Sequence, residues 1–441
     1  MPVSYATPGV YVEEVDRGTK PIEGAGTSIT AFMGISAEAS IKKLNPDTGD
    51  MEVVEKVPNR AMLVTNWTQY QSIFGGFLAD AYLPDAVYGY FANGGGACYV
   101  TSLHSKDHEP QAAKPRPRTK KGESEEAAPK DPPAPATPII DANAIKGDAT
   151  DRTGLAGLEV FDDISLIVCP DIWHGYDHKD KAQQERIRLI QTEMITHCEN
   201  MQYRFALLDT PPGLSAQQAL EWRQFVNFDT AYAAMYYPWI EVADYSDRDE
   251  QSKMVPPSGH VVGIYNRADA ERGVHKAPAN EVVLGAVDLE LNLTKGEQGT
   301  LNPKGINCIR AFPGRGIRVW GARTLSSDGS WRYINVRRLF NFVGSSLDTG
   351  LQWVVFEPND QTLWAKVSRD ISAFLKVVWR SGALFGTTPD KAFYVKVDEE
   401  INPPEIRDLG QLIIEVGLAP VKPAEFVILR ISQWAGADAE E

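Results

Sequence analysis

The stretch that decides the fold is ISLIVCPDIWHGYDHKDKAQQERIRLIQTEMITHCENMQYRFALL, residues 164–208. It begins with the short apolar run Ile164–Cys169, which predicts a buried strand. Apolar residues then recur every three or four positions across Lys181–Met201, which predicts an amphipathic helix. A second apolar run, Arg204–Leu208, predicts the next strand. A strand, a helix and a strand in this order indicate an α/β fold.

The same alternation continues on both sides of this stretch. Upstream, we expect strands at Thr27–Ser36 and Ala97–Leu103 and helices at Thr68–Phe74 and Ala86–Ala92. Downstream, we expect a helix at Ser215–Phe225, opened by a Ser215/Gln218 capping box, and strands at Ala231–Tyr237 and Val261–Tyr265. The predicted fold class is therefore α/β, with a mixed, largely parallel sheet flanked by helices.

The C-terminal third adds further elements. Helical periodicity predicts helices at Val336–Leu347 and Gln361–Ser381. We expect strands at Gln352–Phe356, Ala392–Val397, Gln411–Val416 and Glu425–Ile431. A length of 441 residues predicts two to three domains.

The charge of the chain argues against nucleic acid as a partner. The 44 Lys and Arg are outnumbered by 59 Asp and Glu, which gives a formal net charge of −15. Phosphate backbones bind basic surfaces, so nucleic acid is not an expected partner. Residues 104–138 contain eight prolines and no large apolar residue, so we expect a disordered, Pro-rich surface insertion there.

The cysteines and the apolar segments indicate the cellular compartment in which the chain folds. The four cysteines, Cys98, Cys169, Cys198 and Cys308, are scattered without a C-x-x-C pair, which predicts buried free thiols in a reducing environment. Residues 1–11 lack the features of a signal peptide, and we expect no membrane-spanning segment and no membrane insertion. The expected place of synthesis is the cytoplasm.

Catalytic signatures are absent from the sequence. It contains no phosphate-binding loop, zinc-protease motif or nucleophile elbow, so we expect no enzyme activity, no cofactor and no metal. Ser258, His260 and Asp269 could form a triad only by chance. His174 and His178 have the spacing of zinc ligands on a helix, but neighbouring Pro and Gly favour a loop.

The sequence favours contact surfaces over a catalytic site. The cluster Arg315, Arg318, Trp320 and Arg323 is either a contact surface rich in Arg and Trp or a strand pair with exposed arginines. The 361–381 helix has a predicted buried stripe, and its other charges would form a docking face for an acidic partner or an ordinary solvated face. These charges are Lys366, Arg369, Asp370, Lys376 and Arg380.

Both chain ends carry short β-like runs. They are Val10, Tyr11 and Val12 near the start, and Phe426, Val427, Ile428, Leu429, Arg430 and Ile431 near the end. A terminal strand most often completes its own sheet. The alternative is that it adds to the sheet edge of a neighbouring subunit.

Five stretches resemble the tail sheath proteins of contractile phages and related injection particles. The most specific are PPSGHVVGIYNRADAERGVHKAPAN (256–280) and PGRGIRVWGARTL (313–325). Three further stretches also resemble this family and occur in its order: TPGVYVEE (7–14), FANGGGACYV (91–100) and WRYINVRRL (331–339). The 104–138 insertion has no counterpart in a minimal member of this family.

The resemblance implies a structural subunit that polymerises as stacked hexameric rings around an inner tube. Contraction of the rings would drive the tube through a target cell envelope, and the terminal arms would pair with neighbouring subunits. The implied partners are further copies of the chain, the inner tube protein, and baseplate and terminal cap proteins. The particle would be a phage tail, a bacteriocin or an extracellular injection system. An α/β hydrolase-like enzyme and a non-contractile helical coat protein are the alternatives.

The resemblance also implies a division of the chain. We expect an N-terminal arm (1–24), an N-terminal part of the α/β region (25–103), the insertion (104–138), a middle α/β region (139–255), a tube-facing core (256–421) and a C-terminal arm strand (422–441). In this division the 361–381 helix faces the tube.

Overall fold

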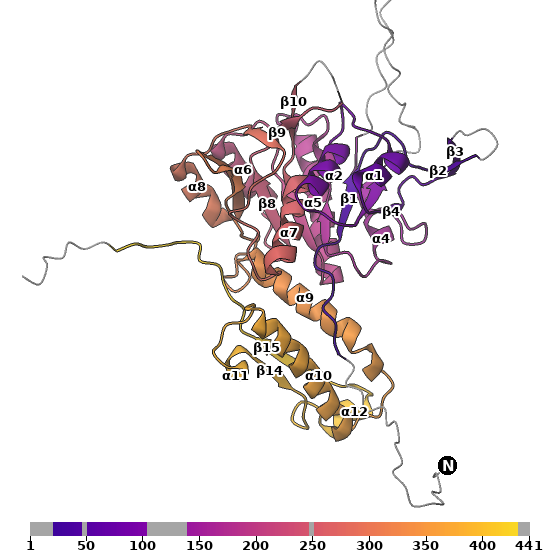
Figure 1. Ribbon diagram of the computed structural model, residues 1–441, viewed down its shortest axis with the longest axis vertical. Coiled ribbons are helices and arrows are strands. Elements are labelled where there is room, and N and C mark those ends of the chain that lie inside the picture. Colours follow the sequence, from indigo (N-terminus) through magenta and orange to yellow (C-terminus); the bar gives the residue numbers. More distant parts are fainter. Residues whose placement is uncertain (1–20, 46–50, 104–138, 247–250, 431–441) are drawn as a thin grey trace, which may run out of the picture. The chain divides into compact units, whose positions relative to one another are not determined.

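The computed structural model describes residues 21–45, 51–103, 139–246 and 251–430, which form two compact units (Figure 1). The larger, here called the sheet unit, comprises Ala25–Ser345 and Pro420–Glu441. The smaller, here called the small unit, comprises Ser346–Ala419 with Met1–Gly24. The predicted arm residues Val10–Val12, the 104–138 insertion and Ile431 lie outside the described residues, and the domain ranges given above stay predictions.

The sheet unit is built on eight strands in the order β13-β12-β8-β7-β6-β1-β5-β4. The six inner strands are parallel, and β4 and β13 are antiparallel edges. The strands are β1 Thr30–Gly34, β4 Ala61–Val64, β5 Cys98–Ser102, β6 Leu166–Val168, β7 Phe205–Asp209, β8 Ala233–Tyr237, β12 Ile306–Phe312 and β13 Gly316–Val319. The predicted α/β class with a largely parallel sheet is confirmed.

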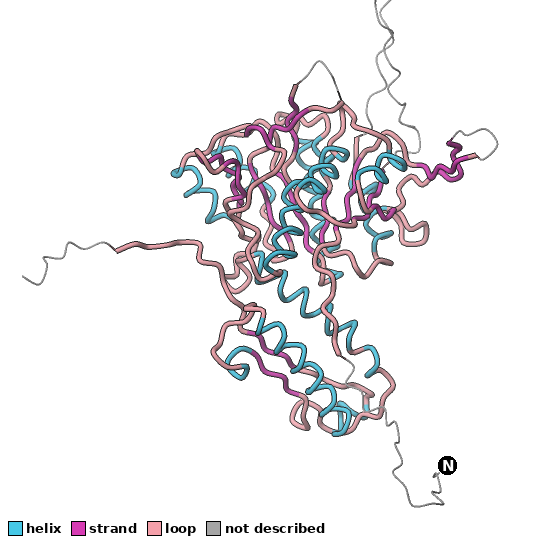
Figure 2. The backbone as a smooth tube through the Cα atoms, viewed as in Figure 1, coloured by secondary structure: helices cyan, strands magenta, loops and turns pink. Residues whose placement is uncertain are grey.

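Helices cover both faces of this sheet (Figures 1 and 2). Alternate residues of the strands enter two separate apolar cores, as the two-residue period of a strand requires. On one face lie α3 Ala142–Lys146, α4 Gly154–Leu158, α5 Lys181–Met201, α6 Ala216–Val226 and α8 Lys295–Leu301. On the other lie α1 Trp67–Phe74, α2 Leu83–Ala92 and α7 Ser258–Arg272.

Most predicted elements of the sheet unit form where the sequence placed them. The α5 helix spans the predicted 181–201, and α6 begins with the Ser215/Gln218 capping box. The four cysteines are buried and free, as expected. Two short antiparallel sheets complete the unit, β2 Ser40–Leu44 with β3 Met51–Lys56, and β9 Ile240–Ala243 between β10 Ser252–Val255 and β11 Ala286–Leu289.

The predicted strand Val261–Tyr265 is wrong, because these residues lie inside helix α7. Every residue of α7 from Ser258 to Asn266 is buried, so the helix has no polar face to reveal its period. Gly259 and Gly263 let α7 approach α2 closely. A Cβ on Gly259 would lie 2.4 Å from the Cα of Ala86.

The small unit is mainly helical. It holds the end of α9 Ile334–Gly350, α10 Gln361–Arg380, α11 Pro389–Ala392, α12 Pro404–Asp408 and the antiparallel pair β14 Phe393–Lys396 and β15 Glu415–Leu418. The predicted strand Gln352–Phe356 is wrong, since Gln352–Val354 forms a 3₁₀ turn. The predicted strand Gln411–Val416 forms only from Glu415. Within the described residues, no helix has the length and apolarity to span a membrane.

Candidate functional site: a filled switch point and candidate assembly surfaces

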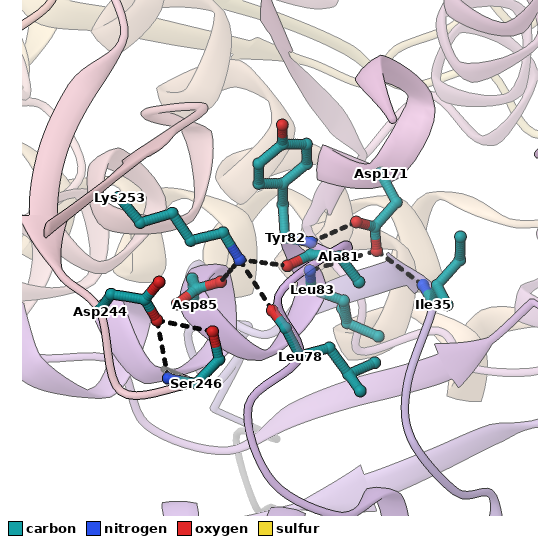
Figure 3. Close-up of polar contacts among 10 residues, drawn as sticks. All are labelled: Ile35, Leu78, Ala81, Tyr82, Leu83, Asp85, Asp171, Asp244, Ser246 and Lys253. Carbon is teal, nitrogen blue, oxygen red and sulfur yellow. Dashed lines mark hydrogen bonds and ion pairs between the residues drawn. The ribbon is translucent and has the colours of Figure 1, made fainter. Parts of the chain in front are cut away.

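The crevice where α/β sheets usually bind ligands is filled by a carboxylate of the chain itself. The strand order changes direction at β1, with β5 on one side and β6 on the other, and such a switch point is the usual ligand site. Here Asp171, just after β6, occupies it (Figure 3). Its Oδ2 accepts from Ile35 N at 2.6 Å and Leu83 N at 3.1 Å, and its Oδ1 accepts from Tyr82 N.

Asp171 therefore takes the place of an anionic ligand at the N-terminus of α2. The side chain is 1 % exposed, and burial raises its pKa to about 6 although the three N–H donors favour the charged form. The neighbouring Gly34 makes room for it, because a Cβ there would lie 2.3 Å from Asp171 Oδ2.

A second carboxylate has the same position on α7. Asp209 ends β7 and accepts from Ser258 N at 2.9 Å and from Ser258 Oγ at 2.6 Å. Burial raises the pKa of Asp209 to about 7, against the hydrogen bonds from Ser258. Both carboxylates occupy helix N-termini that could otherwise hold a substrate phosphate or carboxylate.

A buried ion pair connects the first turn of α2 to β10 (Figure 3). Lys253 Nζ lies 2.9 Å from Asp85 Oδ2 and also donates to the carbonyls of Leu78 and Ala81. The Lys253 and Asp85 side chains are 10 % and 3 % exposed. Removing one partner of such a pair leaves an uncompensated buried charge.

The candidate catalytic groups do not come together. The Ser258 hydroxyl donates to Asp209, and the carboxylate of Asp269 pairs with Arg338 at 2.5 Å. The buried His260 Nδ1 has no hydrogen-bond partner, and burial lowers its pKa to about 4. His174 ends a 3₁₀ turn, as the loop hypothesis expected, and the described residues contain no cluster of three metal-ligating side chains.

The C-terminal run lies open on the surface. Residues 421–430 have no regular secondary structure and pair with no strand in the part of the chain that the structure describes. Phe426, Val427, Ile428 and Leu429 are 73 %, 79 %, 81 % and 80 % exposed. Four consecutive large apolar side chains in water are unusual for a soluble monomer and mark a contact site. The predicted strand Glu425–Ile431 is wrong for residues 425–430, which join no sheet among the described residues.

The residue just before this run is held firmly. Arg323 contacts Glu425 through two hydrogen bonds, Nε to Oε1 at 2.9 Å and Nη2 to Oε2 at 2.7 Å. Asn302 Nδ2 donates to Oε1 at 2.6 Å, and the Tyr333 hydroxyl donates to Oε2 at 3.1 Å. We call these four residues the Glu425 clamp. The sequence did not suggest it, because Glu425 is distant in sequence from its partners.

The other three residues of the 313–325 cluster lie apart from the clamp. The Arg315 guanidinium lies 5.6 Å from the Trp320 ring, and Arg315 Nη2 donates to Asn280 Oδ1 at 2.9 Å. Arg318 donates to the Asn280 carbonyl at 2.7 Å. Arg315 stays exposed, so both sequence hypotheses for these three residues stay open, whereas Arg323 is engaged within the chain.

The small unit carries unpaired sheet edges. β14 and β15 pair only with each other among the described residues. A two-stranded sheet is marginal alone, and its outer edges offer free N–H and C=O groups. Many large apolar side chains of the small unit are also exposed: Val355, Phe356, Val377, Phe385, Tyr394, Leu409 and Ile413.

Helix α10 has the predicted buried stripe and a basic face. Lys366, Arg369, Lys376 and Arg380 are exposed and fall on one stripe about 21 Å long, from 14 residues at about 1.5 Å each. The prediction that Asp370 lies on the surface is wrong. Its side chain is 4 % exposed, because its helical phase places it beside Val367 and Phe374. The exposed face is therefore more basic than predicted.

Comparison with known proteins identifies phage tail sheath domains in this chain. Residues 156–325 match the phage tail sheath protein central domain, and residues 326–433 match the phage tail sheath C-terminal domain. A tail sheath protein of Burkholderia phage BcepMu is 28 % identical over 238 residues, covering 50 % of this chain and 47 % of the relative. The chain spans about half or less of the length of such phage relatives.

Solved structures match along nearly the whole chain. The contracted sheath complex of the extracellular contractile injection system PVC is 29 % identical, with a TM-score of 0.69 and coverage of 98 % of both chains. A chain of the 6-fold symmetrised baseplate of the anti-feeding prophage (AFP) is 28 % identical, with a TM-score of 0.68 and coverage of 98 % of this chain and 100 % of that one.

Proposed function

The chain belongs to the phage tail sheath protein family, and from this premise we propose that it is a structural subunit of a contractile sheath. In this proposal, subunits stack as six-fold rings around an inner tube, and contraction drives the tube through a target cell envelope. The similarity to the contracted PVC sheath supports contraction. The similarity to a chain of a 6-fold symmetrised baseplate supports the ring symmetry and contact with a baseplate.

One observation carries the assembly mechanism: the chain has both an unpaired arm and unpaired sheet edges. The exposed run Phe426–Leu429 has no strand partner among the described residues, while β14 and β15 offer free edges. Addition of a strand to an exposed edge satisfies backbone groups and buries apolar side chains together. We propose that the C-terminal arm of one subunit adds to β14 or β15 of a neighbour, and that Val10–Val12 of the N-terminal arm acts in the same way.

The basic face of α10 is the proposed contact with the inner tube. Lys366, Lys376 and Arg380 make no ion pair within the described residues, so they are available to an acidic partner. Polar contacts suit a surface that must hold before contraction and release afterwards, because they are weak in water and screened by salt. Terminal cap proteins complete the proposed set of partners.

The proposal does not include catalysis or nucleic-acid binding. Asp171 and Asp209 fill the helix N-termini at the carboxyl edge of the sheet, which argues against a hydrolase-like site. The charge of −15 disfavours nucleic acid. Assembly would take place in the bacterial cytoplasm, and the particle would then act as a phage tail or a released injection system.

The test is a truncation that removes residues 422–441. We expect the shortened chain to remain folded, since the sheet cores do not include these residues, but to form no tubules in negative-stain micrographs. Tubules of normal appearance from the truncated chain would refute the exchange of the C-terminal arm. A non-contractile coat would instead show a single helical form under all conditions.

A further inference from the structure

The C-terminal arm changes abruptly at residue 425. Glu425 is 18 % exposed in its side chain, whereas the next residue, Phe426, is 73 % exposed. Among the described residues, the Glu425 carboxylate accepts from Arg323, Asn302 and Tyr333, so each of its oxygens accepts two donors. The Glu425 side chain is thus held on the sheet unit, whereas the side chains of Phe426–Leu429 are exposed.

The donors are themselves held in place. Asn307, fully buried on β12, donates Nδ2 to the Arg323 carbonyl at 2.8 Å and accepts from Arg323 N at 2.7 Å. A β-bridge joins Arg323 to Tyr333, which places both side chains for the same carboxylate. A planar guanidinium gripping a carboxylate with two parallel bonds fixes direction as well as position.

A second attachment lies four residues earlier. Asn335 Nδ2 donates to the Val421 carbonyl at 3.1 Å and to the His275 carbonyl at 2.8 Å. Residues 421–425 are therefore docked on the sheet unit at both ends, without forming a strand. The burial of Glu425 opposes its ionisation, but hydrogen bonds from Arg323 and Asn302 outweigh this effect and hold its pKa below the ordinary value.

We infer that Glu425 is a positioning residue, which fixes the point and the direction in which the C-terminal arm leaves the sheet unit. The inference rests on the proposed arm exchange for its biological consequence, but the clamp itself exists in the single chain. The free length of the arm begins at Phe426, so the reach of the arm to a neighbour is set by the clamp. Loss of the clamp adds residues 422–425 to this length, because the next attachment is at Val421, and it lets the arm leave in many directions.

The clamp can be tested in dilute, monomeric protein. The four native cysteines are buried, so a cysteine introduced as Phe426→Cys or Leu429→Cys takes up a nitroxide spin label selectively. We expect restricted motion of the label at 426 and fast motion at 429. Glu425→Ala and, independently, Arg323→Met should lower the restricted fraction at 426 about tenfold or more, as expected for loss of charge-assisted hydrogen bonds.

The matched control is Arg318→Met. Arg318 lies on β13 and donates to Asn280 and Arg315, with no hydrogen bond or ion pair to residues 421–430, so the label at 426 should stay restricted. Two results would overturn the inference: a label at 426 as mobile as one at 429 in the chain with an intact clamp, or a label that stays restricted in both Glu425→Ala and Arg323→Met.

An assembly assay distinguishes a failure of this inference from a failure of the proposed function. Deleting residues 426–441 leaves the clamp intact and removes the arm, so tubules formed by that deletion would refute arm exchange and leave the clamp result standing. If arm exchange holds, Glu425→Ala should give tubules with a broadened helical pitch, while Arg318→Met tubules keep a single pitch. A single, unchanged pitch in Glu425→Ala tubules would contradict the role of Glu425 in setting the arm's direction.

Discussion

The two faces of the arm should differ in their importance for assembly. In a strand, alternate side chains point to opposite faces, so Phe426 and Ile428 share one face and Val427 and Leu429 share the other. All four are at least 73 % exposed in the single chain. A neighbour that accepts this strand at a sheet edge buries at least one of the two faces.

The magnitude follows from the side chains. Full burial of one large apolar side chain contributes about 1.5–3 kcal/mol, so a two-residue face contributes about 3–6 kcal/mol. That corresponds to about two to four orders of magnitude in affinity. Since the residues are exposed before assembly, their replacement should change the free energy of unfolding by no more than about 0.5 kcal/mol.

The perturbation is a pair of double variants, each the control for the other. One carries Phe426→Ser with Ile428→Ser, and the other carries Val427→Ser with Leu429→Ser. We measure the critical concentration for tubule formation by sedimentation, and the fold by thermal unfolding. The pair on the buried face should raise the critical concentration at least about 100-fold. If neither pair changes it, apolar burial of the arm does not drive assembly.

Three further predictions concern the charged groups. The double variant Lys366→Glu with Arg369→Glu should bind the tube more weakly in a co-sedimentation assay, and its binding should depend less on salt. The control Lys391→Glu, elsewhere on the small unit, should bind as the unchanged chain does. Equal binding by the double variant and the control would mean that another surface faces the tube. Asp171→Ala leaves three backbone N–H donors without their acceptor and should cost about 3 kcal/mol or more in urea unfolding, and a loss below about 1 kcal/mol would contradict its structural role. Because burial raises the pKa of Asp209 from 3.8 to about 7, the folded state binds the extra proton, and the free energy of unfolding should fall as the pH rises from about 4 to 7. Asp209→Asn should flatten this dependence, and an unchanged slope would exclude Asp209 as its source.

Local periodicity predicted the helices that bury one face and expose the other. Helices α5 and α10 each bury one face, so their sequences show the 3.6-residue period and their bounds were found closely. Helix α7 has no such asymmetry, because it is buried on all sides along its first half. Its Val-Val-x-Ile-Tyr run imitates a buried strand, and only the spacing of Gly259 and Gly263 hinted at a closely packed helix.

The polar contacts of Asp171 and Glu425 could not be predicted from the sequence, because they join residues that are far apart in the chain. Asp171 meets Ile35 and Leu83 through chain separations of 136 and 88 residues, and Arg323 meets Glu425 through 102. No local pattern marks such pairs. The sequence singled out Arg323 as a candidate for an interface with a partner, whereas the structure shows it paired with Glu425 of its own chain. Asp370 was misplaced because a charge was assumed to lie on the surface.

Covalent trapping of the arm on a neighbouring subunit tests the central claim most directly. One protein carries Ile428→Cys, and the other carries a single new cysteine placed in turn along β14 and β15. The native cysteines are buried and do not interfere. Mixed tubules under mild oxidation should give disulfide-linked heterodimers at one or more positions, and monomeric mixtures should give none. The absence of heterodimers at every position in tubules would contradict arm exchange onto these edges.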